Sequence, residues 1–320
     1  MRTYIIQRLL LMVPTLILVS LATFSLLRLV PGDTLTAQIQ SAGTSGAQYN
    51  QARLLQMRKQ LGINGSVPDQ FARWVKNIAH GNFQKSFLTN QDTLAQFGTR
   101  VTVTLELGVL TVVFGVLVGI PLGVISGVYQ DSGADYVSRV LAILGIAIPN
   151  FVLALLVIVF ASRWLGYAFP RGSHPLLKDP VTNLQQFVVP ALVLAAASTG
   201  FIMRLMRTSI LEVMRQDYIR TARAKGLRMR RIIARHSLRN AIIPVITVVG
   251  AQITAVISGA VIVEQIFNLR GAGQLTLTAI QQRDYPQVQT NVLVFALVLV
   301  LGNLLTDLAY GFIDPRIRFS

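Results

Sequence analysis

The sequence lacks cysteine and is poor in charged residues. Its 320 residues include no Cys and only three His, and 13% of them are Asp, Glu, Lys or Arg. The absence of Cys excludes disulfides, thiolate chemistry and Cys-based metal sites. His80, His174 and His236 are too scattered to give metal-ligand spacing. A chain of this length with so few charges is not typical of a soluble domain.

Motifs for nucleotide binding and catalysis are also missing. The sequence contains no G-x-x-x-x-G-K-[ST] loop, no Ser/His/Asp set and no carboxylate pair at catalytic spacing. For His236 we favour a place on a helix beside Arg235 and Arg239 over a catalytic role. We therefore expect this chain to be no enzyme and to hold no metal or cofactor of its own.

Long apolar runs dominate the sequence instead. Hydrophobic residues make up 52% of the chain, and about 20 consecutive apolar residues suffice for a helix to cross a bilayer. The first run is followed by no small-residue cleavage site, so we interpret it as a retained span rather than a signal peptide. The pattern predicts an all-α membrane protein with six spans, at 9–30, 101–129, 140–162 (interrupted at Pro149-Asn150), 181–203, 241–263 and 285–310.

The polar segment between the first two spans predicts a helical extracytoplasmic insert. It contains a mildly amphipathic piece at 52–61 and an aromatic-bearing piece at 71–87. The expected domains are thus an N-terminal span at 1–30, the insert at 31–100 and a five-helix transmembrane domain at 101–320.

The distribution of basic residues predicts the orientation of the spans. Short segments on the side of both termini carry sixteen Lys or Arg, and the two short loops on the opposite side carry five. Because cytoplasmic loops are enriched in Lys and Arg, both termini are expected in the cytoplasm.

The segment 204–240, between spans four and five, is the one long strongly charged stretch. Eleven Lys or Arg lie between Arg204 and Arg239, against Glu212 and Asp217. Apolar residues within it recur at helical spacing. We predict a short helix from Tyr218 to Lys225, with Asp217 as its cap and Gly226 ending it.

This short helix is suited to contacting another protein on the cytoplasmic face. The alternative is that its cations anchor the segment at anionic lipid headgroups. That role suits Arg228, Arg230 and Arg231, beyond the helix, better. The net charge of +16 is explained by membrane topology, so nucleic acid is not an expected partner.

Several motifs resemble those of a known family. Tyr218-Ile-Arg-Thr-Ala-Arg-Ala-Lys-Gly226, followed by His236-Ser-Leu-Arg-Asn-Ala241, resembles the cytoplasmic loop of permeases of ATP-binding-cassette (ABC) importers. Further motifs along nearly the whole chain are similar to the B-type permease of dipeptide, oligopeptide and nickel uptake systems. Among them are Pro31-Gly32-Asp33, Gly119-Ile-Pro-Leu-Gly123, Arg283-Asp-Tyr-Pro286 and Asp314-Pro-Arg-Ile-Arg318. One departure is Arg270, where these permeases usually have Pro.

The resemblance implies that the short helix couples the spans to a cytoplasmic ATPase. Closure of the ATPases around ATP would reach the spans as a rigid-body movement. Ala222 and Ala224 are expected to leave room for close contact with the ATPase. The implied coupling residues are Asp217, Tyr218, Arg220, Thr221, Ala222, Arg223, Ala224, Lys225 and Gly226.

The resemblance also implies partners and a substrate. The chain would work with a second, homologous permease of the C type, two ATPase subunits or domains, an extracytoplasmic substrate-binding protein and membrane lipid. ATP and Mg would bind to the ATPase partners. The implied cargo is short peptides. Similar permeases take up nickel chelates, glutathione, opines or sugars, and a stand-alone channel or carrier is a further alternative.

Polar residues within the spans are candidates for the transport pathway. Asn150, Gln252, Thr254 and Ser258 would line it if they face the interior of the bundle, although such residues also mediate helix packing. Charges within spans are costly and often functional. We nevertheless interpret Glu106 as interfacial, and Asp307 as structural, paired with Arg139 or an arginine of the charged segment.

Overall fold

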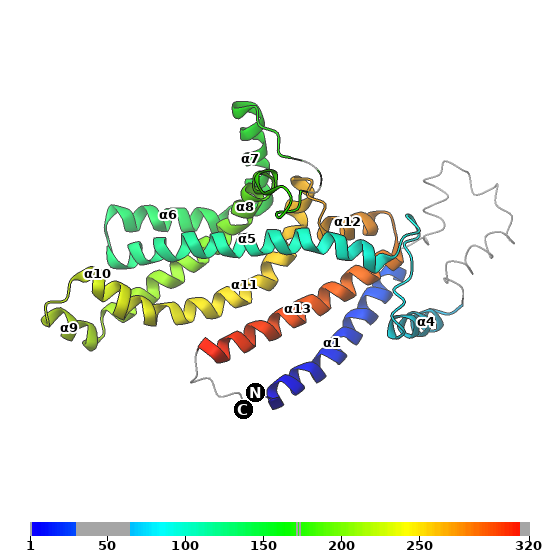
Figure 1. Ribbon diagram of the computed structural model, residues 1–320, viewed down its shortest axis with the longest axis horizontal. Helices are drawn as coiled ribbons and strands as arrows, with labels where there is room; N and C mark the ends of the chain where they lie inside the picture. Colours follow the sequence, from blue (N-terminus) through cyan, green and yellow to red (C-terminus); the bar gives the residue numbers. More distant parts are fainter. Residues whose placement is uncertain (1, 30–64, 171, 173, 314–320) are drawn as a thin grey trace. The chain divides into compact units, whose positions relative to one another are not determined.

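The computed structural model describes residues 2–29, 65–170, 172 and 174–313, with the backbone alone at 2–5, 251, 253–255, 257, 258, 305 and 307–313. Within these residues the regular secondary structure is helical, and one isolated bridge joins Lys85 and Asp92. The predicted pieces at 31–33, 52–61 and 314–318 lie outside the described residues. The helices (Figure 1) are α1 (Arg2–Leu29), α4 (Val67–Ala79), α5 (Thr93–Val128), α6 (Gly133–Ala147), α7 (Asn150–Leu165), α8 (Pro180–Met214), α9 (Asp217–Ala224), α10 (Met229–Arg231), the π-helix η2 (Ile232–Ser237), α11 (Leu238–Ile266), α12 (Ala272–Gln281) and α13 (Tyr285–Ile313).

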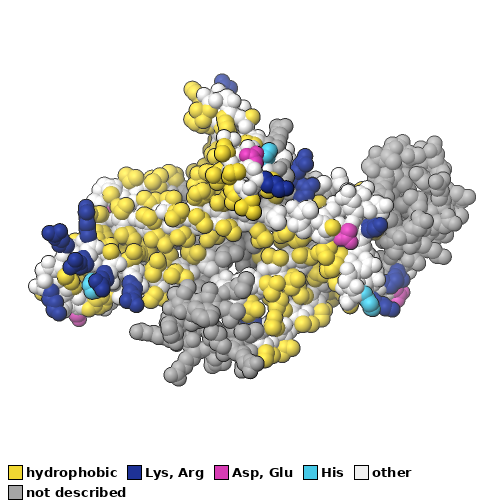
Figure 2. All heavy atoms as spheres, viewed as in Figure 1, with side chains coloured by type: hydrophobic (Ala, Val, Ile, Leu, Met, Phe, Trp, Pro, Cys, Tyr) yellow, Lys and Arg dark blue, Asp and Glu magenta, His cyan; other side chains and the backbone are white. Residues whose placement is uncertain are grey.

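The helices confirm the prediction of an all-α protein with several membrane spans. Among the described residues, five helical stretches are long and apolar enough to cross a bilayer, and the number is six if the bent pair α6–α7 forms one span. Figure 2 shows hydrophobic side chains covering much of the visible surface along these helices. A surface of this kind is stable facing lipid rather than water.

The third predicted span differs from the observed structure. The run at 140–162 is divided between α6 and α7, whose axes are bent by 103°. Pro149 explains the break, because proline has no N–H to donate and disfavours helical geometry at the preceding residue. Ile148 accordingly adopts an extended conformation, with φ −83° and ψ 119°.

Helix α8 also extends further than predicted. The expected span at 181–203 is part of a continuous 35-residue helix that ends only at Met214. Asp179 caps its start by accepting a hydrogen bond from the Thr182 backbone N–H. Hydrogen bonds from Thr182 and His174 hold the pKa of this exposed carboxyl below its ordinary value. The first third of the predicted cytoplasmic segment therefore belongs to α8.

The described chain divides into two compact units. The first comprises the residues up to 102 together with 271–304, and the second comprises 103–270 together with 305–313. In the first unit the ring of Phe24 in α1 packs edge-on against Phe71 of α4 at 5.2 Å, and the Arg28 guanidinium lies 3.6 Å from the Phe24 ring centre. The buried Asp284 carboxylate accepts hydrogen bonds from Ser86 and from the Phe87 backbone N–H.

In the second unit, α5 packs very closely against α8 along a seam of glycines. Gly119, Gly123 and Gly127 recur every four residues and so lie on one face of α5. A Cβ added at each would lie within 2.9 Å of a side-chain atom of Ile202, Met206 and Ile210, respectively. Glycine permits this close approach of two helices, as is common within membranes.

A second seam joins α6 to α8. A Cβ on Gly145 of α6 would lie 2.6 Å from the Ala196 carbonyl oxygen, and a Cβ on Gly200 of α8 would lie 2.5 Å from the Ala142 carbonyl oxygen. Helix α8 thus has two tightly packed neighbours.

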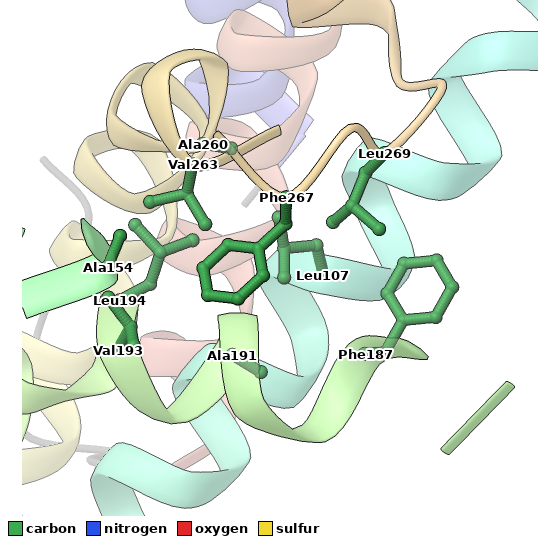
Figure 3. Close-up of a cluster of buried hydrophobic side chains, with 10 residues drawn as sticks. All are labelled: Leu107, Ala154, Phe187, Ala191, Val193, Leu194, Ala260, Val263, Phe267 and Leu269. Atoms are coloured by element: carbon green, nitrogen blue, oxygen red, sulfur yellow. The ribbon is translucent and has the colours of Figure 1, made fainter. Parts of the chain in front are cut away.

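Buried apolar clusters lie along α8. One surrounds the Phe267 ring, which lies among Leu107, Ala191 and Leu194 (Figure 3). The next, closer to the end of α8, is formed by Ile202, Met206, Ile210, Ala241 and Val245. Helix α8 therefore contributes to both cores of the second unit.

We predict that Gly123→Ala destabilises the protein, because the new methyl group would overlap Met206 and the Met203 carbonyl. Overpacking of this kind costs about 1–3 kcal/mol, against a helix-propensity gain of about 1 kcal/mol. The melting temperature of the detergent-solubilised protein should fall. Gly98→Ala, in the same helix but with nothing within 4 Å of the added Cβ, is the matched control and should be neutral or slightly stabilising. Equal melting temperatures for the two variants would contradict the close packing of α5 against α8 at Gly123.

Candidate coupling site

The short helix α9 begins directly after the long helix α8. The end of α8 at Met214 is followed by Arg215 and Gln216, and Gln216 takes an extended conformation that turns the chain into α9. At the other end Gly226 has a φ of +73°, a region that glycine adopts without strain. The predicted turn at Gly226 is therefore present, and α9 is separated from its neighbours by a sharp turn on each side.

Two side chains fix α9 to the rest of the second unit. Ile219 and Ala222, three residues apart and so on one face, are buried against Ile232 at the start of η2. Met214 of α8 and Leu227 pack against the same cluster. This cluster draws on α8, α9 and η2, so α9 is packed against the end of α8 and the start of η2.

Polar contacts connect the same elements. The Asn240 side-chain amide of α11 donates a hydrogen bond of 2.9 Å to the Tyr218 hydroxyl. Ser237, at the end of η2, contacts the Met214 sulfur at 3.2 Å. The π-helical turns of η2 connect directly into α11, so α9 is attached to the span that follows it as well as to α8.

The remaining face of α9 is exposed and, with its C-terminal turn, carries three basic side chains and one acidic one. Figure 2 shows Lys and Arg side chains gathered at the end of the second unit where α9 and α10 lie. The Arg220–Asp217 contact of 3.5 Å involves side chains that are 77% and 94% exposed, so it contributes little stability. The exposed residues of α9 and its C-terminal turn are Asp217, Tyr218, Arg220, Thr221, Arg223, Ala224, Lys225 and Gly226.

Comparison with known proteins identifies the family of this chain. The family profile described as "Binding-protein-dependent transport system inner membrane component" matches residues 119–319, and the profile for the N-terminal part of the same kind of component matches 1–107. The chain belongs to this permease family. The resemblance predicted from the sequence motifs is thereby confirmed.

Named relatives match the permease over its whole length. It is 36% identical over 320 residues to a Brucella abortus (strain 2308) protein provisionally named as a peptide transport system permease, with all of both chains covered. It is 35% identical over 341 residues to the dipeptide transport system permease protein DppB of Escherichia coli (strain K12), with 99% of each chain covered.

Solved structures share the fold of the permease at low sequence identity. A structure of the MetNI methionine ABC transporter in inward-facing conformations matches with a TM-score of 0.55 and 18% identity, over 69% of this chain and 97% of that chain. An amino acid ABC transporter with histidines matches with a TM-score of 0.52 and 16% identity, over 70% and 95% of the two chains.

The structure of α9 departs from the sequence prediction in two respects. Asp217 is the first helical residue, the cap position belongs to Gln216, and no side chain caps this helix. Ala222 is not available to a partner, because its side chain is buried in the cluster with Ile232. A periodic pattern shows which residues share a face of a helix, but it does not show which face packs against the protein. In α9 the packed face is the one with Ile219 and Ala222.

The candidate pathway residues are only partly described by the structure. Asn150 is the first residue of α7 and is half-buried, and Gln252 is half-buried in α11. The side chains of Thr254 and Ser258 lie outside the described residues. Lining of a pathway by these four residues stays a prediction.

The structure describes some of the acidic residues in and beside the spans. In Glu106, one carboxylate oxygen is buried and has no hydrogen-bond partner among the described residues. Glu264, one residue beyond the predicted span at 241–263, lies fully buried within α11 and accepts a hydrogen bond from Thr104. The Asp307 side chain is outside the described residues. Arg139, one of its proposed partners, lies 3.4 Å from Asp135.

The reasoning from sequence missed both ion pairs of Asp135, the one with Arg139 and the one with Arg207. Arg207 of α8 forms a salt bridge with Asp135 of α6, 72 residues away in the chain. The local sequence indicates only that Asp135 lies in the first turn of a helix. In the structure the backbone N–H of Asp135 donates a hydrogen bond to the side chain of Ser132, which caps that helix. No spacing rule relates it to Arg207.

We predict that Ile219→Ala releases α9 from the cluster with Ile232. Truncating a fully buried Ile costs about 2–5 kcal/mol, which is enough to shift the local docking equilibrium of an eight-residue helix. Hydrogen exchange of the amides at 217–225 should become faster by orders of magnitude. Arg220→Ala on the exposed face is the control and should leave the exchange nearly unchanged. Equal exchange in the two variants would show that the cluster does not hold α9.

Proposed function

We propose that this chain is a transmembrane permease subunit of an ABC importer that moves short peptides across the bacterial inner membrane. The family membership and the names of its full-length relatives support this function. The structural observation that supports it most is the placement of α9, a short helix with exposed Arg side chains that is anchored between two long apolar helices. A helix held in this way can pass a displacement from a partner to the spans.

The proposal assigns energy use to other chains. Two ATPase subunits or domains bind ATP and Mg and contact the exposed face of α9. A second permease of the C type supplies the other half of the pathway, and an extracytoplasmic protein delivers the substrate. Both termini lie in the cytoplasm, and the segment 31–100 lies on the opposite side of the membrane, where it contributes to docking of the delivery protein.

The exposed face of α9 suits an ATPase surface of opposite charge. Arg220, Arg223 and Lys225 project from the helix and its end. Ile219 and Ala222, in contrast, are occupied in holding α9 to its own chain. In this proposal the exposed cations recognise the ATPase, and the buried Ile219 and Ala222 transmit the displacement to the rest of the chain.

Reversing this charge should uncouple the permease from its ATPases. In Arg223→Glu/Lys225→Glu, like charges facing an acidic partner cost several kcal/mol, so the ATPase recovered with the tagged permease should fall about tenfold or more. Arg228→Glu/Arg230→Glu changes the same charge beyond the helix and is the matched control. Gly226→Asp, at the turn, should also reduce recovery. Equal recovery of ATPase with both charge-reversed proteins would refute the role of α9.

The peptide substrate can be tested separately in proteoliposomes that contain the complete importer. Uptake of a labelled dipeptide should require ATP, and unlabelled di- and oligopeptides should compete with it. Nickel chelates, glutathione, opines and sugars are the matched non-peptide competitors. If one of these compounds competes and peptides do not, the substrate of the permease belongs to that class of compound rather than to the peptides. Uptake without ATPase subunits would support a channel or carrier instead.

A further inference from the structure

Asp135 joins three helices of the second unit. Its carboxylate accepts two hydrogen bonds from the Arg207 guanidinium of α8, at 2.9 Å from Nε to Oδ1 and 3.0 Å from Nη2 to Oδ2. It also accepts one from the Ser126 hydroxyl of α5 and one from the backbone N–H of Asp131. The Asp135 side chain is fully buried, and that of Arg207 is 19% exposed. Bidentate contacts of this kind are strong and directional.

The ion pair between Asp135 and Arg207 lies close to α9. Arg207 precedes the end of α8 by seven residues, or about 10 Å of α-helix. Ile210 and Met214 follow it and belong to the apolar packing around the end of α8. Met214 in turn packs against Ile219 and Ala222 of α9. An unbroken series of contacts therefore leads from α9 to Asp135.

The glycine seam between α5 and α8 ends at the same place. A Cβ on Gly127, the residue after Ser126, would lie 2.7 Å from a methyl carbon of Ile210 and 3.1 Å from the Arg207 carbonyl oxygen. Helix α5 is thus in close contact with α8 at the level of the ion pair. Interdigitated packing resists separation of two helices, and the bidentate pair adds resistance to sliding and rotation.

We propose that Asp135 is a positioning residue for transport, which through Arg207 locks the α5–α6 hairpin to α8. A displacement of α9 by the ATPases is then carried into α5 and α6 together with α8. This inference rests on the proposed function. Without the ion pair between Asp135 and Arg207, the C-terminal end of α8 moves without α5 and α6. ATP is then hydrolysed with little transport.

A role in stability alone is the competing explanation. Replacing a buried ion pair by apolar residues is often neutral or stabilising, so stability by itself gives little reason for charges at this place. The two explanations predict different measurements. A stabilising role changes the amount of assembled protein, whereas a positioning role changes the amount of peptide moved per ATP hydrolysed.

The experiment uses the complete importer in proteoliposomes, with ATP turnover and labelled dipeptide uptake measured in the same sample. In Asp135→Asn and Arg207→Gln, uptake per ATP should fall about 2- to 30-fold, the range found for broken coupling contacts. Glu212→Gln is the matched control, because it removes one acidic charge from an exposed side chain of α8 and leaves the contacts of Asp135 intact. Its ratio of uptake to ATP turnover should equal that of the wild type.

Two further variants distinguish positioning from folding. The double variant Asp135→Arg/Arg207→Asp restores opposite charges and should recover part of the lost ratio. Arg207→Lys keeps the charge but loses the fork geometry, and its ratio should lie between those of the wild type and Arg207→Gln.

The outcomes separate the inference from the proposed function. A wild-type importer that binds no ATPase or moves no peptide overturns both. If the wild type transports while Asp135→Asn and Arg207→Gln match Glu212→Gln, the positioning role alone is overturned. If these two variants do not assemble, Arg207→Lys decides. A wild-type ratio in that variant, or its failure to assemble as well, assigns the pair to folding and overturns the positioning role.

Discussion

The close packing of α5 and α6 against α8 is the constraint on which the second unit depends. Gly119, Gly123 and Gly127 allow one helix to approach, and Gly145 and Gly200 allow the other. In a bilayer, where lipid is as apolar as the side chains, such contacts rather than burial from water hold helices together. Because α8 is a single helix from Pro180 to Met214, it connects the cluster around Phe267 with the cluster that anchors α9.

This arrangement also explains where the charges of the second unit are found. The exposed cations of α9 contribute little to the fold and are free to serve recognition. The buried pair of Asp135 and Arg207 is inaccessible to a partner and acts within the chain. Under the two proposals, surface charge and buried charge have separate tasks, the first in recognition of the ATPase and the second in holding α5 and α6 to α8.

Hydropathy and motifs were sufficient to predict the helical membrane fold and the family, but not the details of the site. The apolar runs indicated the spans, because a helix that crosses a bilayer needs about 20 apolar residues. Pro149 indicated where the third span breaks but not the angle of the bend. The inward face of α9 was misjudged at Ala222, since periodicity does not say which side meets the protein. The pairing of Asp135 with Arg207 depends on three helices packing, which no local pattern encodes. The domain boundaries, the coupling residues and the pathway residues stay predictions.

The small size of α9 has a consequence for assembly of the importer. Eight residues are too few to form a stable helix in water, because nucleation of a helix is costly. The shape of α9 therefore exists only while Met214, Leu227 and Ile232 are packed beneath it. Under the proposed function, a permease whose spans have inserted or packed wrongly offers its ATPases no surface to bind. Recruitment of the ATPases would then act as a quality control, in which only correctly folded permeases gain access to ATP.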